Sequence, residues 1–426
     1  MIRLIILLII LSGCSLNDQL GIWEKKKTVS IDNKNNSKIL FQQKIIKKEL
    51  NPQLKIKLLD NKKYYNIDKN LNNDVVYYNG LLDNISKFKF SKIKNFKKFE
   101  AEPAFHKDNV IFFNNKGTIF NLNKKNLINW KKNIYLKNEK KKNPTLFFRA
   151  NDNQLIVTDN LGKYYSLEIN SGNLLWSKNN SAPFNSEIKI DNKKIYVTDI
   201  ENILRCYSMQ DGSEIWSLKT EKIFLKSQKK TSIIIKGDAV IFNNTGGDIT
   251  AVNKNNGELL WQVSTNTKNS TQNLSFLKTS ELISYKDYIF FSNNFNDAYL
   301  IDSTSGTIVW KQNINSTIKS TIINGLIFTI TKNGFLVITE LSSGNILRIT
   351  DIFNNIKKRE IVKPVGFIFG INKIYLSTSS GKLMIINIEN GKNVKTIKLD
   401  KDVISKPYIF NKNLLLIKDN SLLTVN

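Results

Sequence analysis

The chain has 426 residues, and its hydrophobic fraction of 41% is enough for a substantial core. Lys and Arg exceed Asp and Glu by 64 to 36, which gives a formal net charge of +28. Such a charge suits nucleic acid or an anionic membrane. The lysines are spread along the chain, however, and the runs at 25–27, 137–142 and 226–230 fall in expected loops or linkers. We therefore interpret the charge as solvated surface and predict no nucleic-acid partner.

The N-terminus has the layout of a secretory signal. Arg3 supplies a short positive start, and residues 4–11 are an unbroken apolar run that is too short to span a bilayer as a helix. The sequence Leu11-Ser-Gly-Cys14 follows directly and resembles the lipobox of bacterial lipoproteins. This resemblance implies a signal peptide at 1–13 and acylation of Cys14. The alternative is an ordinary signal peptide that contains a cysteine.

Residues 15–80 show no regular repeat and are dominated by Lys and Asn. We predict a lipid-anchored linker over 14–80. The second cysteine, Cys206, lies in an alternating stretch that predicts a strand. It has no partner for an intramolecular disulfide if Cys14 carries lipid, so we expect it to be a small core residue.

The rest of the chain consists of copies of one sequence repeat, of which residues Gly247 to Trp261 are the clearest example. Each copy has an apolar strand, a tight turn, an alternating strand and a second turn. Gly, Asn and Asp tolerate the positive φ of such hairpin turns. The first turns are centred on Gly117, Gly162, Asn202, Gly247, Asp297, Gly334, Gly381 and Asn420.

A tryptophan usually stands four residues after the Gly of the second turn, whose place Asn126 takes in the first copy. It is Trp130, Trp176, Trp216, Trp261 or Trp310 in the first five copies. Arg348 and Lys395 replace it in copies six and seven. We expect these tryptophans to pack between neighbouring repeats as structural wedges.

The eighth copy ends one strand short of a four-stranded unit. An open fourth position would expose a sheet edge, which proteins avoid. Residues 85–90, or the neighbouring 96–99, lie just before the first copy and can fill this position. We therefore predict an all-β fold over 81–426, an eight-bladed β-propeller of four-stranded antiparallel blades closed by an N-terminal strand.

The repeat resembles the pyrroloquinoline-quinone-type propeller repeat, and together with the lipobox the chain resembles the BamB family. These are propeller lipoproteins of the outer-membrane β-barrel assembly machinery. The resemblance implies a non-enzymatic scaffold that binds a BamA-type assembly protein or unfolded outer-membrane proteins, as a monomer within a hetero-complex. Ser15 after the lipidated position implies the outer membrane, facing the periplasm.

In that family a loop after the third blade's tryptophan contacts the assembly partner through two apolar residues and an Arg. Ile223 and Leu225 match the apolar pair, and Lys226 stands at the Arg position. Lys keeps the charge but lacks the planar fork of Arg. The alternative is a strand whose apolar residues face the next blade.

Catalytic groups are scarce. His106 is the only histidine, and we expect it to be a solvated loop residue. No nucleophile elbow or phosphate-binding loop is present. We predict no catalytic, cofactor or metal site. Two alternatives remain: a quinone-dependent periplasmic dehydrogenase, whose relatives carry adjacent cysteines and calcium, and a propeller that binds an anionic cell-envelope polymer.

Overall fold

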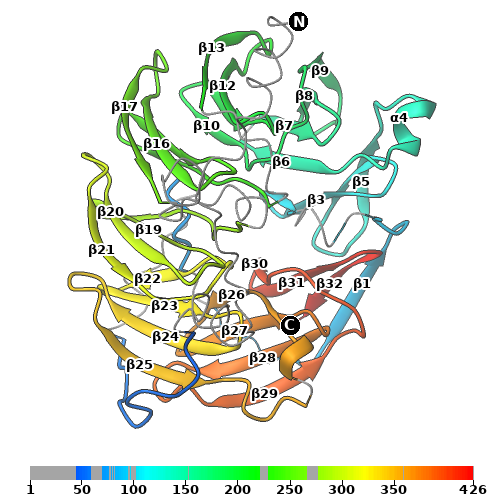
Figure 1. Ribbon diagram of the computed structural model, residues 1–426. Helices are drawn as coiled ribbons and strands as arrows, with labels where there is room; N and C mark the ends of the chain where they lie inside the picture. Colours follow the sequence, from blue (N-terminus) through cyan, green and yellow to red (C-terminus); the bar gives the residue numbers. More distant parts are fainter. Residues whose placement is uncertain are drawn as a thin grey trace, which may run out of the picture. The chain divides into compact units, whose positions relative to one another are not determined.

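In the part of the chain that the structure describes, thirty-two short strands alternate with turns, and they group into eight separate four-stranded antiparallel sheets. The computed structural model describes residues 45–425 except for 59–69, 76–77, 79, 81, 95, 97–101, 152, 221–228, 266–276 and 358. The eight sheets stand around a central axis as the blades of a propeller (Figure 1). The predicted fold class is therefore confirmed.

Each of the first four blades uses four consecutive strands, which follow one another from the innermost to the outermost. Blade 1 has β2 (Ala104–His106), β3 (Asn109–Phe113), β4 (Ile119–Leu122) and β5 (Ile128–Lys132). Blade 2 has β6 (Leu146–Ala150), β7 (Gln154–Asp159), β8 (Lys163–Glu168) and β9 (Leu174–Asn179). Blade 3 has β10 (Lys189–Asp191), β11 (Lys194–Thr198), β12 (Ile203–Ser208) and β13 (Glu214–Lys219). Blade 4 has β14 (Ile233–Lys236), β15 (Ala239–Asn243), β16 (Asp248–Asn253) and β17 (Leu259–Ser264).

The next three blades repeat this order, and the last one departs from it. Blade 5 has β18 (Ile283–Tyr285), β19 (Tyr288–Ser292), β20 (Ala298–Asp302) and β21 (Ile308–Gln312). Blade 6 has β22 (Thr321–Ile323), β23 (Leu326–Ile330), β24 (Phe335–Glu340) and β25 (Ile346–Asp351). Blade 7 has β26 (Pro364–Phe369), β27 (Lys373–Thr378), β28 (Lys382–Asn387) and β29 (Asn393–Lys398). Blade 8 has β30 (Tyr408–Phe410), β31 (Asn413–Lys418), β32 (Ser421–Val425) and β1 (Ile85–Lys89).

Blade 8 joins the two ends of the propeller. The N-terminal strand β1 pairs antiparallel with the last strand β32, in a register that places Ile85 opposite Val425 and Lys89 opposite Ser421. This pairing supplies the strand that the eighth repeat lacks. The prediction of closure by residues 85–90 is confirmed, and of the two segments considered it is this one that forms the strand.

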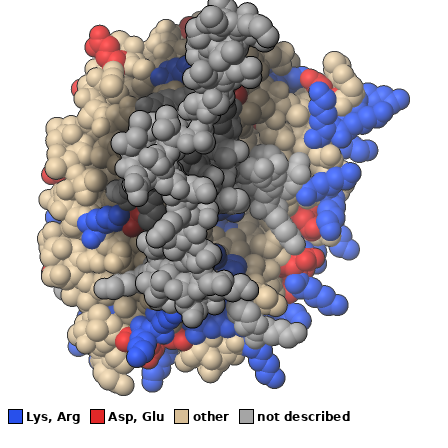
Figure 2. Space-filling model, in the orientation of Figure 1, with Lys and Arg blue, Asp and Glu red and all other residues tan. Residues whose placement is uncertain are grey.

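Among the described residues, α4 (Lys137–Lys141) and the 3-10 turn η3 (Arg359–Ile361) lie outside the blades. Lys and Arg side chains project around α4 on the face seen in Figure 2. No helix in the described ranges has the length and apolar character needed to cross a bilayer.

In blades 2 to 6 the second turn carries a glycine, and the tryptophan of the preceding blade lies against it. At Gly257, where φ is +76°, a Cβ would lie 2.6 Å from Cε3 of Trp216. The same contact recurs at Gly172 with Trp130, Gly212 with Trp176, Gly306 with Trp261 and Gly344 with Trp310. The glycine and the tryptophan of one repeat therefore act at two different blade junctions, and the predicted wedge role of the tryptophans is confirmed.

Most of these indoles also hydrogen-bond the next blade. The Nε1 of Trp130 donates to the carbonyl of Ile169 at 3.0 Å, and that residue directly follows the third strand of blade 2. Trp176, Trp261 and Trp310 donate to the equivalent carbonyls of Met209, Ser303 and Leu341. Each wedge thus combines aromatic packing with one directional bond.

Arg348 performs this task in blade 6 with a different group. Its side chain is fully buried, and Nη2 donates to the carbonyl of Ile388, the equivalent position in blade 7, at 2.8 Å. Nη1 also donates to the carbonyls of Glu389 and Leu54. The substitution at this repeat position therefore adds a bond to the N-terminal part of the chain.

Residues 49–56, within the range predicted as linker, lie along the outer edge of blade 6. Leu50 and Ile349 exchange two backbone hydrogen bonds of 3.1 and 2.9 Å, as in an antiparallel sheet. The backbone N–H of Ile56 donates to the carbonyl of Glu389 on blade 7 at 2.9 Å, and the Ile56 side chain is buried. This segment therefore bridges the outer ends of two blades.

We expect Gly257→Ala to destabilise the ring more than Gly237→Ala. Both glycines have positive φ, which costs an alanine about 1–2 kcal/mol, but a Cβ at Gly237 meets nothing within 4 Å. The clash with Trp216 adds about 1–3 kcal/mol at Gly257. Urea unfolding of both variants measures the difference, and equal midpoints would contradict the wedge contact.

We expect Arg348→Trp to loosen residues 49–56 while preserving the junction of blades 6 and 7. An indole replaces the bond to Ile388 but not the one to Leu54. Because a charge-assisted hydrogen bond contributes about 1.5 kcal/mol, tryptic cleavage in this segment should become about tenfold faster. Arg205→Met, which removes an ion pair in blade 3, is the control and should leave that cleavage unchanged.

Candidate functional site

The innermost strands surround a central cavity of about 850 Å³. Its described lining comes from all eight blades, either from these strands or from the residues that lead into them. Because the innermost strands are short, the approach segments contribute much of the wall. A cavity of this volume falls within the range of small-molecule sites.

Charged side chains from the approach segments meet across this cavity. Glu102 Oε1, before blade 1, accepts from Lys230 Nζ of blade 4 at 2.6 Å and from Lys406 Nζ of blade 8 at 2.9 Å. Lys406 also donates to Glu281 of blade 5 at 3.1 Å. The second Glu281 oxygen lies 4.0 Å from Lys319 Nζ of blade 6. Four blades and Glu102 are thereby linked through one chain of ion pairs.

The N-terminal part of the chain completes these interactions. Lys319 Nζ donates to Asp74 Oδ2 at 2.8 Å. Lys189 of blade 3 lies 3.1 Å from Glu187 Oε2 and donates to Asn72 Oδ1 at 2.6 Å. We call these charged residues the channel network: Asp74, Glu102, Glu187, Lys189, Lys230, Glu281, Lys319 and Lys406.

Residues 70–75, which we call the channel segment, lie against the innermost strands of blades 4 to 6. The carbonyls of Asn70 and Leu71 accept from the backbone N–H groups of Ile235 and Ser284 at 3.1 and 2.9 Å. Asn73 both donates to and accepts from the backbone of Ile322, at 3.0 Å in each direction. Part of the range predicted as linker therefore occupies the centre of the ring.

The pairing keeps the network charged at neutral pH. Burial alone would raise the pKa of Glu281, but Lys406, Lys319 and Lys230 hold it well below its usual range. Burial alone would lower the pKa of Lys406, but Glu102 and Glu281 hold it well above its usual range. Such groups neither take up nor release protons near pH 7, so they serve electrostatic binding and cohesion better than general acid–base catalysis.

Lys189 behaves differently. Burial lowers its pKa to about 8, and the neighbouring Glu187 only partly opposes this effect. Its side chain is 1% exposed, and its ammonium is held by Glu187 and Asn72. The lysine is therefore a structural part of the contact with the channel segment.

The architecture and the sequence both match known propellers. A model of the family described as outer membrane protein assembly factor BamB matches residues 143–350, from blade 2 into blade 6. BamB of Francisella tularensis subsp. tularensis, also named outer membrane protein assembly factor, is 30% identical over 118 residues. That match covers 28% of this chain and 24% of the relative, about a quarter of that protein's length.

Among solved structures, BamB from Moraxella catarrhalis aligns with a TM-score of 0.67 over 82% of this chain and 99% of that one, at 13% identity. The chain is a BamB-like β-propeller of PQQ-type repeats. The quinohemoprotein alcohol dehydrogenase ADHIIG from Pseudomonas putida HK5 aligns with a TM-score of 0.59 at 9% identity, over 83% of this chain and 78% of that one. At these identities both likenesses show the fold alone.

The residues predicted to carry the BamB-type function lie outside the described residues. These are the lipidation candidate Cys14 and the partner-binding candidates Ile223, Leu225 and Lys226. The loop of the latter three joins blades 3 and 4, and its two following residues are described. Lys229 Nζ donates to the carbonyl of Thr317 at 2.5 Å, and Lys230 belongs to the channel network. The chain that leaves this loop therefore enters the central cavity.

The structure decides three expectations about individual residues. Cys206 is fully buried in β12 and burial raises its pKa to about 12, so its core role is confirmed. His106 is 7% exposed at the end of β2, so the solvated-loop expectation is wrong. The interpretation of the lysine run at 226–230 as solvated is wrong at Lys230, whose side chain is 6% exposed.

The sequence reasoning missed the channel network, although the repeats contain a signal for it. Most of its members occupy one repeat position, two residues before the innermost strand: Glu102, Glu187, Glu281, Lys319 and Lys406. Charges of both signs at a position next to a predicted buried strand indicate mutual pairing. Aligning the repeats at their first strands, rather than at their turns, would have exposed this pattern.

We expect Glu281→Gln to destabilise the BamB-like ring in a pH-dependent manner. The pKa of Glu281 is depressed below its ordinary 4.5, so its stabilisation is present above that pH and is lost as the pH falls. The variant should be less stable by about 3 kcal/mol at pH 7, and the difference should shrink towards pH 3.

Urea unfolding of both proteins at pH 7, 4.5 and 3 measures this effect. Glu258→Gln, at an exposed turn position of blade 4, is the matched control and should change little at any of these pH values. A Glu281→Gln penalty that stayed constant across the range would show that the carboxylate charge has no part in the stabilisation.

Proposed function

We propose that this propeller is a non-enzymatic scaffold lipoprotein of the outer-membrane β-barrel assembly machinery. The observation that supports it most is the match of blades 2 to 6 to the BamB family description, on a closed eight-bladed ring. We further propose that Cys14 carries the lipid anchor and that the protein faces the periplasm from the outer membrane. Its partners would be an assembly protein of the BamA type and unfolded outer-membrane proteins.

The mechanism would be presentation of rigid loops and blade edges. The outermost strands expose aliphatic side chains, among them Leu259 at 55% and Leu260 at 51%. An exposed edge strand accepts an added strand through main-chain hydrogen bonds. Leu50 already does this at the edge of blade 6, so an extended segment fits this type of edge. Extended β-rich precursors are clients of matching chemistry.

The internal chemistry of the ring supports a role without catalysis. The channel network has its carboxylates and most of its lysines fixed in the charged state by mutual contact. Cys206 is held as a thiol in a blade interior and does not line the cavity. These groups hold the scaffold together, and rigidity is what a presenting surface requires.

We expect Ile223→Asp with Leu225→Asp to reduce recovery of the assembly partner. The tagged full-length protein is purified from envelope membranes, and the co-purifying proteins are identified and quantified. Loss of two apolar contacts at the centre of an interface costs several kcal/mol, so recovery should fall by about tenfold or more.

Ile361→Asp is the matched control, because Ile361 is 66% exposed in η3 and lies outside both the loop and the blade edges. Unchanged recovery with the double loop variant would remove this loop from the proposal. Recovery of no envelope assembly protein with the unaltered chain would count against the proposed function itself. Cys14→Ser in the same preparation should move the protein out of the membrane fraction.

A further inference from the structure

The segment between blades 1 and 2 carries a dense cluster of lysines. Residues 131–142, which we call the α4 protrusion, run from the end of β5 through α4 and contain six lysines and one carboxylate. They project from the ring at the upper right of Figure 1, and Figure 2 shows Lys and Arg side chains gathered there. Four of these lysines are exposed: Lys131, Lys137, Lys141 and Lys142.

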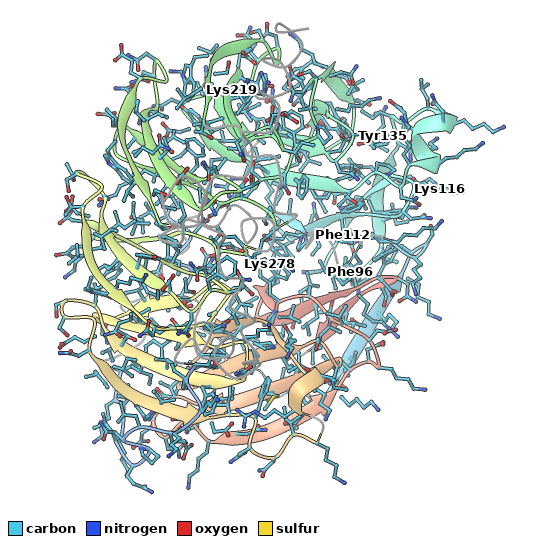
Figure 3. The ribbon with its side chains drawn as sticks, in the orientation of Figure 1. Phe96, Phe112, Lys116, Tyr135, Lys219 and Lys278 are labelled. Carbon is cyan, nitrogen blue, oxygen red and sulfur yellow. The ribbon has the colours of Figure 1, made fainter. Side chains whose placement is uncertain are left out.

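The α4 protrusion is fixed to the blades on either side of it. The ring of Tyr135 is buried, and its hydroxyl donates to Asp159 Oδ2 of blade 2 at 2.6 Å. On the side of blade 1, a Cβ at Gly117 would lie 2.5 Å from Cε2 of Tyr135, and Asn133 Nδ2 donates to the carbonyl of Lys116 at 2.9 Å. Tyr135 and Lys116 are labelled beside α4 in Figure 3. The lysines are therefore presented on a firm base.

The one carboxylate of the α4 protrusion is already paired. Glu139 Oε1 lies 2.8 Å from Nζ of Lys163 on β8. The other oxygen, Oε2, accepts from the backbone N–H of Leu136 at 2.7 Å. Because Glu139 and Lys163 neutralise each other, the six lysines of the protrusion set the sign of the local potential. That potential is positive and attracts an anionic surface.

Leu136 stands among these lysines with its side chain in solvent. At 67% exposure it is the most exposed large hydrophobic side chain of the described residues. No residue of α4 is buried, so the helix is not held to the ring by apolar packing of its own. The leucine adds nothing to the core of the propeller, and its removal from water by a partner is favourable.

The composition of the α4 protrusion distinguishes between classes of partner. Protein interfaces are depleted in lysine and enriched in Tyr, Trp and Arg. Single-stranded nucleic acid is bound by exposed aromatic rings, whereas the ring of Tyr135 is buried. An aliphatic side chain surrounded by lysines instead matches the boundary between headgroups and acyl chains of an anionic membrane.

We propose that the α4 protrusion docks the propeller on a membrane surface that contains anionic phospholipids. The lysines contact the headgroup phosphates, and Leu136 inserts beneath them. Each lysine near such a surface strengthens binding by about fivefold. This contact goes beyond the proposed scaffold function, because it involves neither Cys14 nor the loop at 221–228. It fixes which part of the ring faces the bilayer.

The test is acetylation of lysines in the purified full-length chain mixed with vesicles. One set of vesicles is phosphatidylcholine alone, and the other contains about one third phosphatidylglycerol. Any tether from the N-terminus acts in both lipids, so only a charge-dependent contact differs between them. We expect Lys137, Lys141 and Lys142 to react at least about fivefold more slowly on the anionic vesicles, because phosphate contact shields their ammonium groups. Mass spectrometry measures the rate at each lysine.

Lys124 and Lys125 are the matched control within the same molecule. Both are exposed, and they lie next to Leu127, which is 60% exposed, at the opposite end of β5. That strand has five residues and separates the two lysine clusters by about 17 Å. Acetylation of Lys124 and Lys125 should therefore be the same on both kinds of vesicle.

Lys137→Gln with Lys141→Gln should raise the lipid concentration for half-maximal protection of Lys142 by about 25-fold, because two lysines are lost. Leu136→Ser should raise it by about tenfold, because the inserted apolar group is lost. Lys124→Gln with Lys125→Gln is the control pair of substitutions and should leave it unchanged.

Equal acetylation on the two kinds of vesicle, or equal slowing at Lys124 and Lys125, would overturn the proposal. Soluble polyglutamate, at a carboxylate concentration equal to that of the lipid phosphate, should not protect these lysines. Equal protection by polyglutamate would identify an acidic protein segment as the partner and would also overturn the proposal. The comparison of the two lipids uses the unaltered protein, so it holds even where a variant folds poorly.

Discussion

Five of the eight blade junctions depend on the contact between the tryptophan of one blade and the glycine of the next. A blade is a small sheet that cannot bury both of its faces alone, so its stability lies in its neighbours. The indole fills the space beside a turn that has no side chain, and its N–H bonds the adjoining backbone. This contact sets the spacing of the blades at the rim, and the spacing in turn sets the size of the central cavity.

Ion pairs and hydrogen bonds, rather than aromatic packing, connect the blades across the central cavity. The innermost strands of the propeller are too short to fill the centre with their own side chains. The approach segments therefore bring charges of opposite sign, and residues 70–75 add backbone and amide hydrogen bonds. Aromatic packing therefore stabilises the ring at its rim, and ion pairing stabilises it at its centre. The blades are thus joined to one another at two distances from the central axis.

The blade architecture could be predicted from sequence because its signals are local. Turn glycines, alternating strands and a missing last strand all lie within one repeat or at the chain ends. The contacts of the channel network with the N-terminal part of the chain and the position of residues 49–56 could not, because they join residues such as Asp74 and Lys319 that no local pattern relates. Arg348 illustrates the difference. From the sequence, Arg348 marks only the loss of a tryptophan at this repeat position. In the structure its guanidinium donates to two carbonyls on blade 7 and to one on the N-terminal segment, so it replaces the tryptophan and adds a contact.

Closure by β1 has a consequence for how the protein reaches its native state. The strand is made before blade 1, whereas its partner β32 is the last strand of the chain. Until β32 is made, the edge of β1 therefore lacks its partner, and the closing contact is among the most distant along the chain. Such contacts form slowly and leave strand edges open to misassembly. The propeller thus passes through a period in which it is itself a β-rich chain with open edges, and completion of the C-terminus ends that period.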